Sequence, residues 1–349
     1  MDIALFDYNL PPELIAQVPA RERDESRLMV LNRATSIREL GRFPDILDYL
    51  SGGDALVVNN TRVFKARLLG NRVTGGEVEV FLVRRIEDNP LIWEAMVRPS
   101  RRVKEGESIN FHKACHTDRL SLALKENRGN RWLVEFSSVI SQEKIIDRYG
   151  HVPLPQYIKR PDAPEDVERY QTVFARTDKT GAVAAPTAGF HFTESLLEQV
   201  SEKGVELVEL TLHVGPGTFK PVQVDDIDAH TVDPEFAELS QSGADVINRV
   251  RRGGGKIFVV GTTSVRTLES APVVDGKIAP FCGEVDLYIR PGHEFKFVDH
   301  MITNFHLPKS SLLILVSAFA GRESILNAYR QAIANQFRFY SYGDAMLIL

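Results

Sequence analysis

The feature that most constrains the fold of this chain is a change of hydrophobic pattern near residue 65 that reverses near residue 150. Between these points lie short alternating segments, among them GEVEVFLVRR, LIWEAMVRP and RWLVEF, separated by Gly, Asn, Asp and Pro. Such alternation is typical of a small antiparallel sheet or barrel. Helical periodicity returns at about Ser141 with QEKIIDRYG, and helices then alternate with strands up to residue 349.

This pattern predicts an α/β fold with two domains. A discontinuous α/β main domain would comprise residues 1–64 and 151–349, and a small antiparallel, barrel-like β-domain would be inserted at residues 65–150. The 349 residues suffice for two domains. The composition, 43% hydrophobic and 26% charged, is ordinary for a folded soluble protein.

Several features predict a cytoplasmic protein. The start, MDIALFDYNLPPELIAQ, has no basic region followed by an apolar run, so no signal peptide is expected. The longest apolar run, residues 312–320, is too short to span a bilayer and predicts a buried helix. Cys115 and Cys282 show no metal-ligand spacing. Because the formal net charge is −5, any RNA contact must come from local basic patches.

Two glycine-containing loops in residues 183–219 each carry a histidine. AVAAPTAGFHFT places small and turn-forming residues before His191, and LTLHVGPGTF places His213 just before Gly215 and Gly217. A predicted helix and the alternating strand VELVELTLHV lie between the two loops. This order can bring both histidines to one edge of a sheet, where they would form a site. The alternative is that each histidine only satisfies the backbone of its own turn.

Two further loops belong to the α/β part. The predicted strand KIFVV runs into Gly261 and then a helix, and free N–H groups at a helix N-terminus favour an anion or nucleotide. The segment MITNFHLPKSS places Asn304, His306 and Lys309 on a loop ahead of an apolar helix that Ser310 or Ser311 can cap. Glycine turns of the first kind occur in any α/β protein, so that motif alone is weakly specific.

These motifs together resemble the S-adenosylmethionine:tRNA ribosyltransferase-isomerase family of queuosine biosynthesis. The segments that carry the resemblance are AVAAPTAGFHFT, LTLHVGPGTFKPV, VVGTTSVRTLES and ITNFHLPKSSLLILVSAFAG. The similarity extends from FDYNLPPELIAQVPARERDESRLMVL through LVVNNTRVFKARLLG to the C-terminal region. Several long motifs in one order are far more specific than a single GxGxxG. The predicted two-domain architecture agrees with what the resemblance implies.

The resemblance implies a transferase that modifies tRNA. Its reaction would transfer and isomerise the ribosyl group of S-adenosylmethionine onto the 7-aminomethyl-7-deazaguanine at the tRNA wobble position. The products would be epoxyqueuosine, adenine and methionine. S-adenosylmethionine would be a co-substrate, so we expect no cofactor. We expect tRNA, through its anticodon loop, as the other partner, with no membrane contact and a monomeric enzyme.

That chemistry needs a base and an acid. A base must remove a proton from the ribose C5′, which the sulfonium acidifies, and an acid would help adenine to leave. Histidine suits both roles because its pKa is near neutrality. The predicted catalytic residues are therefore His191, His213 and His306, and the sequence leaves open which is acid and which is base.

The predicted substrate-binding residues lie on the same loops. Backbone groups of the glycine loops would bind adenine, and a carboxylate or an aromatic face would meet the sulfonium. A cation would bind the methionine carboxylate, and Arg266 is the candidate, with a helix-surface ion pair as its alternative role. The predicted set is Thr187, Gly189, Phe190, Gly215, Gly217, Thr262, Thr263, Arg266, Asn304 and Lys309.

The segment RPSRRVK is the predicted RNA-binding site. It contains Arg98, Arg101, Arg102 and Lys104 and no acidic residue. A second basic segment, RVRRGGGK, lies at 249–256. The alternative for both is an ordinary solvated surface. Unstacked anticodon bases would suit a nearby aromatic ring, for which Tyr157 and Tyr170 are candidates.

One position departs from the family pattern. Asp233 stands where the family usually has a second histidine after His230, so this segment ranks below the three histidine loops. His230, Asp233 and Glu235 could imitate a metal site, but three ligands on one short proline-containing segment have poor geometry, and we expect no metal.

Two other functions compete with the family assignment. A methyltransferase would need a glycine-rich loop after the first strand of the α/β domain, whereas NNTRVF follows ALVV. A non-catalytic RNA-binding module would leave the three histidine loops without a purpose.

Overall fold

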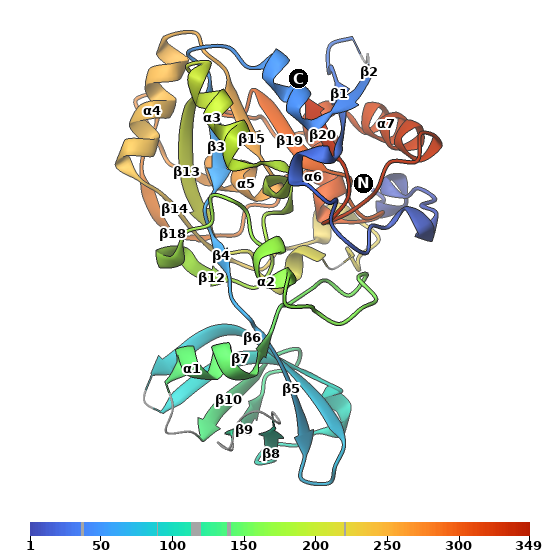
Figure 1. The fold of residues 1–349 in the computed structure, drawn as a ribbon, viewed down its shortest axis with the longest axis vertical. Coiled ribbons are helices and arrows are strands. Elements are labelled where there is room, and N and C mark those ends of the chain that lie inside the picture. The colour runs from blue at the N-terminus through green and yellow to red at the C-terminus, as the bar shows by residue number, and fades with distance from the viewer. Residues whose placement is uncertain (36–37, 89, 113–119, 138–140, 220) are drawn as a thin grey trace. The chain divides into compact units, whose positions relative to one another are not determined.

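The computed structural model describes residues 1–349 apart from 36–37, 89, 113–119, 138–140 and 220. Its contacts divide the chain into two compact units (Figure 1). The α/β unit consists of Met1–Arg62, Pro155–Arg160 and Gln171–Leu349, and the barrel unit of Val63–Leu154 and Pro161–Tyr170. By its contacts, Pro161–Tyr170 groups with the barrel unit, although it lies beyond the predicted insertion at 65–150.

Nine strands form one sheet in the α/β unit. They are β1 (Arg27–Leu31), β2 (Arg38–Arg42), β3 (Ala55–Asn59), β13 (Glu206–Leu212), β14 (Glu235–Leu239), β15 (Ile257–Val260), β18 (Phe281–Val285), β19 (His300–Asn304) and β20 (Ala345–Ile348). Their order is β18-β14-β13-β3-β15-β19-β20-β1-β2. The central group β13-β3-β15-β19 is parallel, so its carboxyl ends share one edge of the sheet.

The connections create a crevice at that edge. From β3 the chain reaches β13 on one side, and from β15 it reaches β19 on the other side. Because the two connections leave in opposite directions, a space opens beyond the carboxyl ends of β3 and β15. Ligands bind at such a point in open α/β sheets.

Helices cover both faces of the sheet. Those of the α/β unit are α3 (Glu194–Glu202), α4 (Gln241–Arg252), α5 (Thr262–Ser270), α6 (Ser311–Ala320) and α7 (Arg322–Ala334). Thr193 caps α3 by accepting a hydrogen bond from the Leu196 N–H, and Ser310 caps α6 in the same way. Among the described residues, no single helix is long and apolar enough to cross a membrane. The bent pair α6 and α7, 113° apart, meets that length and composition only when taken together.

Strand β3 shows why the sheet needs two covering layers. All five of its residues are buried. Ala55 and Val57 pack into one core cluster together with residues of α4 to α7, whereas Leu56 and Val58 pack into a second cluster with residues of α3. Because successive side chains of a strand point to opposite faces, an unbroken apolar run fits only a sheet that is covered on both sides.

The barrel unit contains a closed antiparallel barrel of six strands, which confirms the predicted fold class. Its strands are β5 (Arg67–Arg72), β6 (Glu77–Asp88), β7 (Leu91–Arg98), β8 (Ser108–Phe111), β9 (Leu120–Asn127) and β10 (Trp132–Ser137). They pair in the order β5-β6-β7-β10-β9-β8, and β5 pairs with β8 to close the ring. The unit also holds α1 (Gln142–Tyr149), α2 (Asp166–Arg169) and the short β11 (Gly150–His151), which pairs with β5. The remaining short strands of the chain are β4 (Arg62–Val63), β12 (Thr180–Ala182), β16 (Val273–Val274) and β17 (Lys277–Ile278).

Closure of the barrel depends on a glycine in β5. A Cβ added to Gly70 would lie 2.7 Å from two ring atoms of Phe111 on β8. We expect Gly70→Ala to lower the free energy of unfolding of the barrel by about 1–3 kcal/mol, because overpacking forces the strands apart. Both tryptophans, Trp93 and Trp132, are buried in this unit, so urea unfolding followed by tryptophan fluorescence measures it directly.

The matched control is Gly76→Ala in the same unit. A Cβ there would meet only the flexible Arg72 side chain, at 3.4 Å. Its unfolding curve should coincide with that of the parent, and equal shifts in both variants would contradict the role of Gly70.

Candidate active site

The loops that follow β13, β15 and β19 meet at one small pocket, together with the segment that precedes His191. The pocket has a volume of about 30 Å³. It therefore lies at the carboxyl edge of the parallel strands, where the topology creates a crevice. Its lining residues are Ala185, Pro186, Thr187, Ala188, Val214, Gly261, Thr262, Thr263, Thr303, Asn304, His306 and Leu312.

The first turn of α5 forms one wall of the pocket. Gly261 precedes this helix with a φ of 86°, which glycine adopts without strain. Its N–H donates to the Ile302 carbonyl, and this bond ties the turn to β19. Thr262 and Thr263, the next two residues, line the pocket. The first N–H groups of a helix have no hydrogen-bond partner within the helix itself. The wall can thus bind a carboxylate or another acceptor.

Asn59, at the end of β3, holds the neighbouring strand end in place. Its side-chain oxygen accepts from the N–H of Leu212, and its Nδ2 donates to the Leu212 carbonyl, at 3.1 and 3.0 Å. The same Nδ2 lies 3.4 Å from Thr263 Oγ1 on α5. In the sequence, the segment NNTRVF after ALVV indicated only that no glycine-rich loop follows this strand. The signal that could have found this role is an asparagine directly after four buried apolar residues.

His191 is enclosed in the core. It is the last residue of the short helix η7 (Thr187–His191) and is 3% exposed. Its Nδ1 lies 2.7 Å from Ser26 Oγ, and its ring packs against Phe43. Burial lowers its pKa to about 4, against the raising effects of the Asp344 carboxylate and the Asn304 side chain. His191 is therefore neutral at pH 7.

His213 is half-buried at the end of β13. Its Nδ1 lies 2.8 Å from Thr61 Oγ1, and its ring stacks on Phe236. A Cβ on Gly181 would come within 2.6 Å of the ring, so glycine is needed for this approach. Burial lowers its pKa, nearby Lys179 lowers it further, and Glu238 raises it. His213 is the most open of the three predicted histidines.

His306 contributes to the pocket wall. Its Nε2 lies 2.8 Å from Thr303 Oγ1, which leaves Nδ1 for other partners. Two tyrosines hold its backbone: the Tyr8 hydroxyl donates to its carbonyl, and the Tyr329 hydroxyl accepts from its N–H at 3.0 Å. Burial lowers the pKa of His306 to about 3. The imidazole is neutral and is fixed in place by its backbone.

Arg266 forms an ion pair, but inside the protein and not on a helix surface. Arg266 and Glu235 are 8% and 7% exposed, and Nη1 donates to Glu235 Oε2 at 2.5 Å. The other carboxylate oxygen accepts from the Gly215 N–H at 2.6 Å. The pair thus connects α5 to the loop that follows His213.

Several other predicted binding residues lie away from the pocket lining. Gly189 is there for packing, because a Cβ would lie 2.5 Å from Phe174. Phe190 is buried and stacks on Tyr342. Lys309 is partly buried, and its Nζ lies 2.9 Å from the Asp7 carboxylate.

In the segment after His230, burial lowers the pKa of His230, and the nearby Asp233 carboxylate opposes this effect. A Cβ on Gly217 would lie 3.2 Å from the Asp233 carboxylate, whereas His230 packs edge-on against Tyr288. Within the described part of the chain, no group of three or more His, Cys, Asp or Glu residues could hold a metal ion. Cys282 is free and exposed, and Cys115 lies outside the described residues.

The predicted RNA-binding residues lie at the end of β7, where Arg98 is the last residue of the strand, and in the segment that follows it in the barrel unit. Arg101, Arg102 and Lys104 are exposed, and the first two lie on the short helix η5 (Ser100–Arg102). Arg98 lies 3.9 Å from Glu79. These cations remain accessible to phosphate groups.

The predicted stacking tyrosines are less accessible. Tyr170 is fully buried, so the stacking role suggested for it is wrong, because no base can reach its ring. The Tyr157 hydroxyl lies 2.5 Å from Ser341 Oγ, and its ring packs against Tyr340. A buried tyrosine packs as an apolar ring, and the sequence alone did not reveal that burial.

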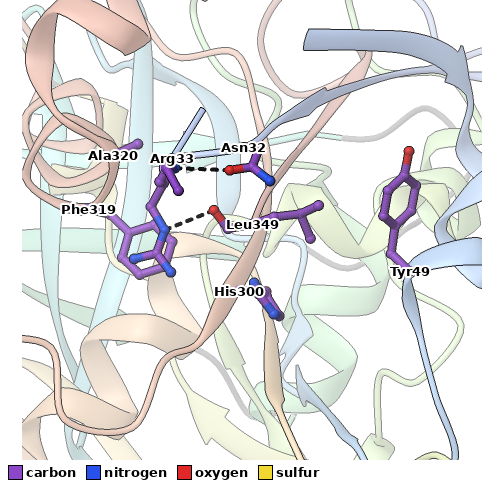
Figure 2. A pocket seen from close by; sticks show the side chains of 8 residues that line it. Asn32, Arg33, Tyr49, His300, Phe319, Ala320 and Leu349 are labelled. Carbon is purple, nitrogen blue, oxygen red and sulfur yellow. Dashed lines mark hydrogen bonds between the residues drawn. The ribbon is translucent and has the colours of Figure 1, made fainter. Parts of the chain in front are cut away.

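A second, open hollow lies at the opposite edge of the sheet, where β19 begins. It has a volume of about 800 Å³ and is lined in part by His300, Phe319 and Leu349. Figure 2 shows the Arg33 side chain against the Phe319 ring, with a hydrogen bond from Arg33 to the Leu349 carbonyl. None of the three predicted catalytic histidines lines this hollow.

Comparisons with known proteins agree with one another. The model of a family described as queuosine biosynthesis protein matches residues 3–348. A solved structure of an S-adenosylmethionine tRNA ribosyltransferase from Thermotoga maritima is similar, at 35% sequence identity and a TM-score of 0.55. The match covers 99% of this chain and 100% of that chain.

The buried ion pair makes a prediction about stability. Glu235→Ala leaves Arg266 as an uncompensated buried charge and frees the Gly215 N–H, so it should lower the free energy of unfolding by about 3–5 kcal/mol. Glu206→Ala is the control, because it breaks the exposed pair with Arg249 and should cost about 1 kcal/mol or less. Urea unfolding followed by far-ultraviolet circular dichroism compares them, and equal losses would contradict this role of the pair.

Proposed function

This chain belongs to the queuosine biosynthesis protein family and is a transferase, and we propose that it modifies tRNA with S-adenosylmethionine as the ribosyl donor. In the proposed reaction the ribosyl group is transferred to the 7-aminomethyl-7-deazaguanine at the wobble position and is isomerised. The product is epoxyqueuosine, and adenine and methionine leave. This proposal combines the family with the chemistry available at the candidate active site.

The observation that carries the proposal is the set of neutral imidazoles at the carboxyl edge of the sheet. Removal of the C5′ proton needs a base, and only a neutral imidazole has a free nitrogen to accept it. Burial lowers the pKa of His213 and His306, so both are in this form at neutral pH. We assign the role of base to His213, which is the least buried of the three histidines. We assign to His306 a contact with the ligand from the pocket wall.

Binding of S-adenosylmethionine requires the loops to open. Pockets for ligands of drug size have volumes of about 300–1,000 Å³, and the pocket here holds about 30 Å³. The strands beneath it are tied together by Asn59, and the loop around Val214 is held by Glu235 through Gly215, so of the loops around Thr187 and Val214 we propose that the one around Thr187 moves. We propose that the ligand lies between these loops and the first turn of α5.

One assay tests this function. The protein is incubated with S-adenosylmethionine and tRNA that carries the aminomethyl-deazaguanine, and the small products are separated. Adenine and methionine in equal amounts support the proposal. S-adenosylhomocysteine would indicate a methyltransferase, and RNA binding without any product would indicate a binding module.

The proposed base makes a prediction about pH. Activity should rise with pH through a pKa below the usual histidine value of 6.5 and reach a plateau, because the base must be deprotonated. His213→Ala should lower kcat by about 10²–10⁴-fold and remove this acidic limb. His300→Ala is the control, since burial also lowers the pKa of His300, at the opposite edge of the sheet. A His213→Ala enzyme that keeps the limb would refute the assignment.

We also propose that the exposed cations after β7 bind the phosphates of the tRNA anticodon loop. The double variant Arg101→Gln/Arg102→Gln should weaken tRNA binding and flatten its salt dependence, by about 0.7–0.9 in the logarithmic slope for each lost phosphate contact. The affinity for S-adenosylmethionine should not change. Measuring the tRNA dissociation constant over a range of salt concentrations tests this.

The matched control is Lys125→Gln/Arg128→Gln in the same unit. These two cations are already paired with Glu135 and Glu126, so their loss should leave the salt slope nearly unchanged. A slope that changes equally in both double variants would show nonspecific attraction instead of a defined site.

A further inference from the structure

We infer that Ser26, His191 and Asn304 form one buried hydrogen-bond chain, in which His191 is a positioning residue that orients the Asn304 amide at the pocket. His191 would then transfer no proton to or from the substrate. The inference rests on the proposed function and changes the role expected for His191. The hydrogen positions in this chain can, however, be measured without any enzymatic activity.

The three side chains come from separate parts of the α/β unit. Ser26 precedes β1, His191 ends η7, and Asn304 ends β19. They are 4%, 3% and 2% exposed. In such surroundings a polar atom without a hydrogen bond costs about 1–3 kcal/mol, so the assignment of hydrogens must leave as few of these atoms unpaired as possible.

The orientation of the Asn304 amide is fixed on one side. Its Nδ2 donates to the Tyr340 carbonyl at 2.9 Å, which identifies the other amide atom as the oxygen. That oxygen and His191 Nε2 are both buried, and neither has a conventional hydrogen bond to any described residue. The Asn304 side chain nevertheless acts on the His191 ring directly and favours its protonated form. Placing the hydrogen on Nε2 puts a donor, and not a second acceptor, toward the Asn304 oxygen.

The hydrogen on Ser26 determines the tautomer. Ser26 Oγ lies 2.7 Å from His191 Nδ1 and 3.4 Å from the Arg23 carbonyl, so the shorter and stronger contact is to the ring. If Nδ1 carried the hydrogen, the lone pair of Nε2 would face the Asn304 oxygen, and two acceptors would oppose each other. Ser26 therefore donates to Nδ1, and Nε2–H donates to Asn304.

This arrangement explains what Asn304 offers to a ligand. Asn304 lines the pocket, and its Nδ2 has a second hydrogen besides the one bonded to Tyr340. An acceptor such as an adenine nitrogen or a carboxylate can take that hydrogen. With Tyr340 on one side and His191 on the other, the amide cannot flip, so the donor is already in place when the ligand arrives.

The surroundings of His191 keep this hydrogen-bond chain in one protonation state. Asp344 favours the protonated ring, whereas Arg338 and Arg23 oppose it. Burial dominates, and the Phe43 ring covers His191. The ring therefore stays neutral throughout the range in which the enzyme would work, and the Nε2–H tautomer persists.

The first test uses substitutions. Glutamine in His191→Gln can accept from Ser26 and donate to Asn304, but it cannot transfer a proton. We expect His191→Gln to retain kcat within about tenfold of the parent, which corresponds to one weakened hydrogen bond. His191→Ala should lose considerably more, and the pH profile of His191→Gln should match that of the parent.

The second test needs no activity. In protein labelled with ¹⁵N-histidine, the His191 ring, assigned by comparison with His191→Gln, should show a protonated Nε2 and an unprotonated Nδ1. Ser26→Ala should shift the Nδ1 resonance, and Asn304→Ala should shift Nε2. Melting temperatures verify that each variant is folded.

The outcomes separate the inference from the proposed function. If the parent releases no adenine, the proposed function fails, while the tautomer measurement still decides the hydrogen-bond chain. A His191→Gln enzyme as inactive as His191→Ala, or one without the acidic limb, would overturn the positioning role. A protonated Nδ1 would overturn the hydrogen-bond chain itself.

Discussion

The structure of the α/β unit depends on the burial of strand β3 on both faces. Its alternating side chains join two apolar layers, so the neighbouring parallel strands and their covering helices must be present together. Parallel strands end at one edge, and the loops that follow them therefore meet there. Asn59 ends this strand and binds both the N–H and the carbonyl of Leu212, so the apolar layer ends in a polar bridge beneath the pocket.

Burial also sets the chemistry of the edge. The same low-dielectric surroundings that stabilise the core lower the pKa of all three loop histidines, because charging a buried ring is costly. Their differences come from local partners. His213 remains half-exposed beside Thr61, whereas His191 is closed in by Ser26 and Phe43. One fold can thus provide both the accessible base that we propose at His213 and the fixed donor that we infer at His191 from the same residue type.

Buried charge has a different use in this unit. Glu235 pairs with Arg266 and also binds the backbone of Gly215, so the ion pair orders the loop that follows His213. A buried pair contributes little net stability because desolvation offsets the attraction, but losing one partner is costly. The pair is therefore better understood as a constraint on loop position than as a source of stability. In the barrel unit, by contrast, Arg101 and Arg102 are exposed and remain available to a phosphate backbone.

The sequence by itself determined the local features. Hydrophobic period distinguished the barrel from the α/β part, and the caps at Thr193 and Ser310 follow from local residue chemistry. Which histidine is accessible, the partner of Arg266 and the link from Ser26 to His191 were decided only by the tertiary structure. Ser26 and His191 are 165 residues apart in the chain, and no local pattern records a contact across that separation. Periodicity reports which face of an element is buried, whereas hydrogen-bond partners depend on which elements become neighbours in the folded sheet.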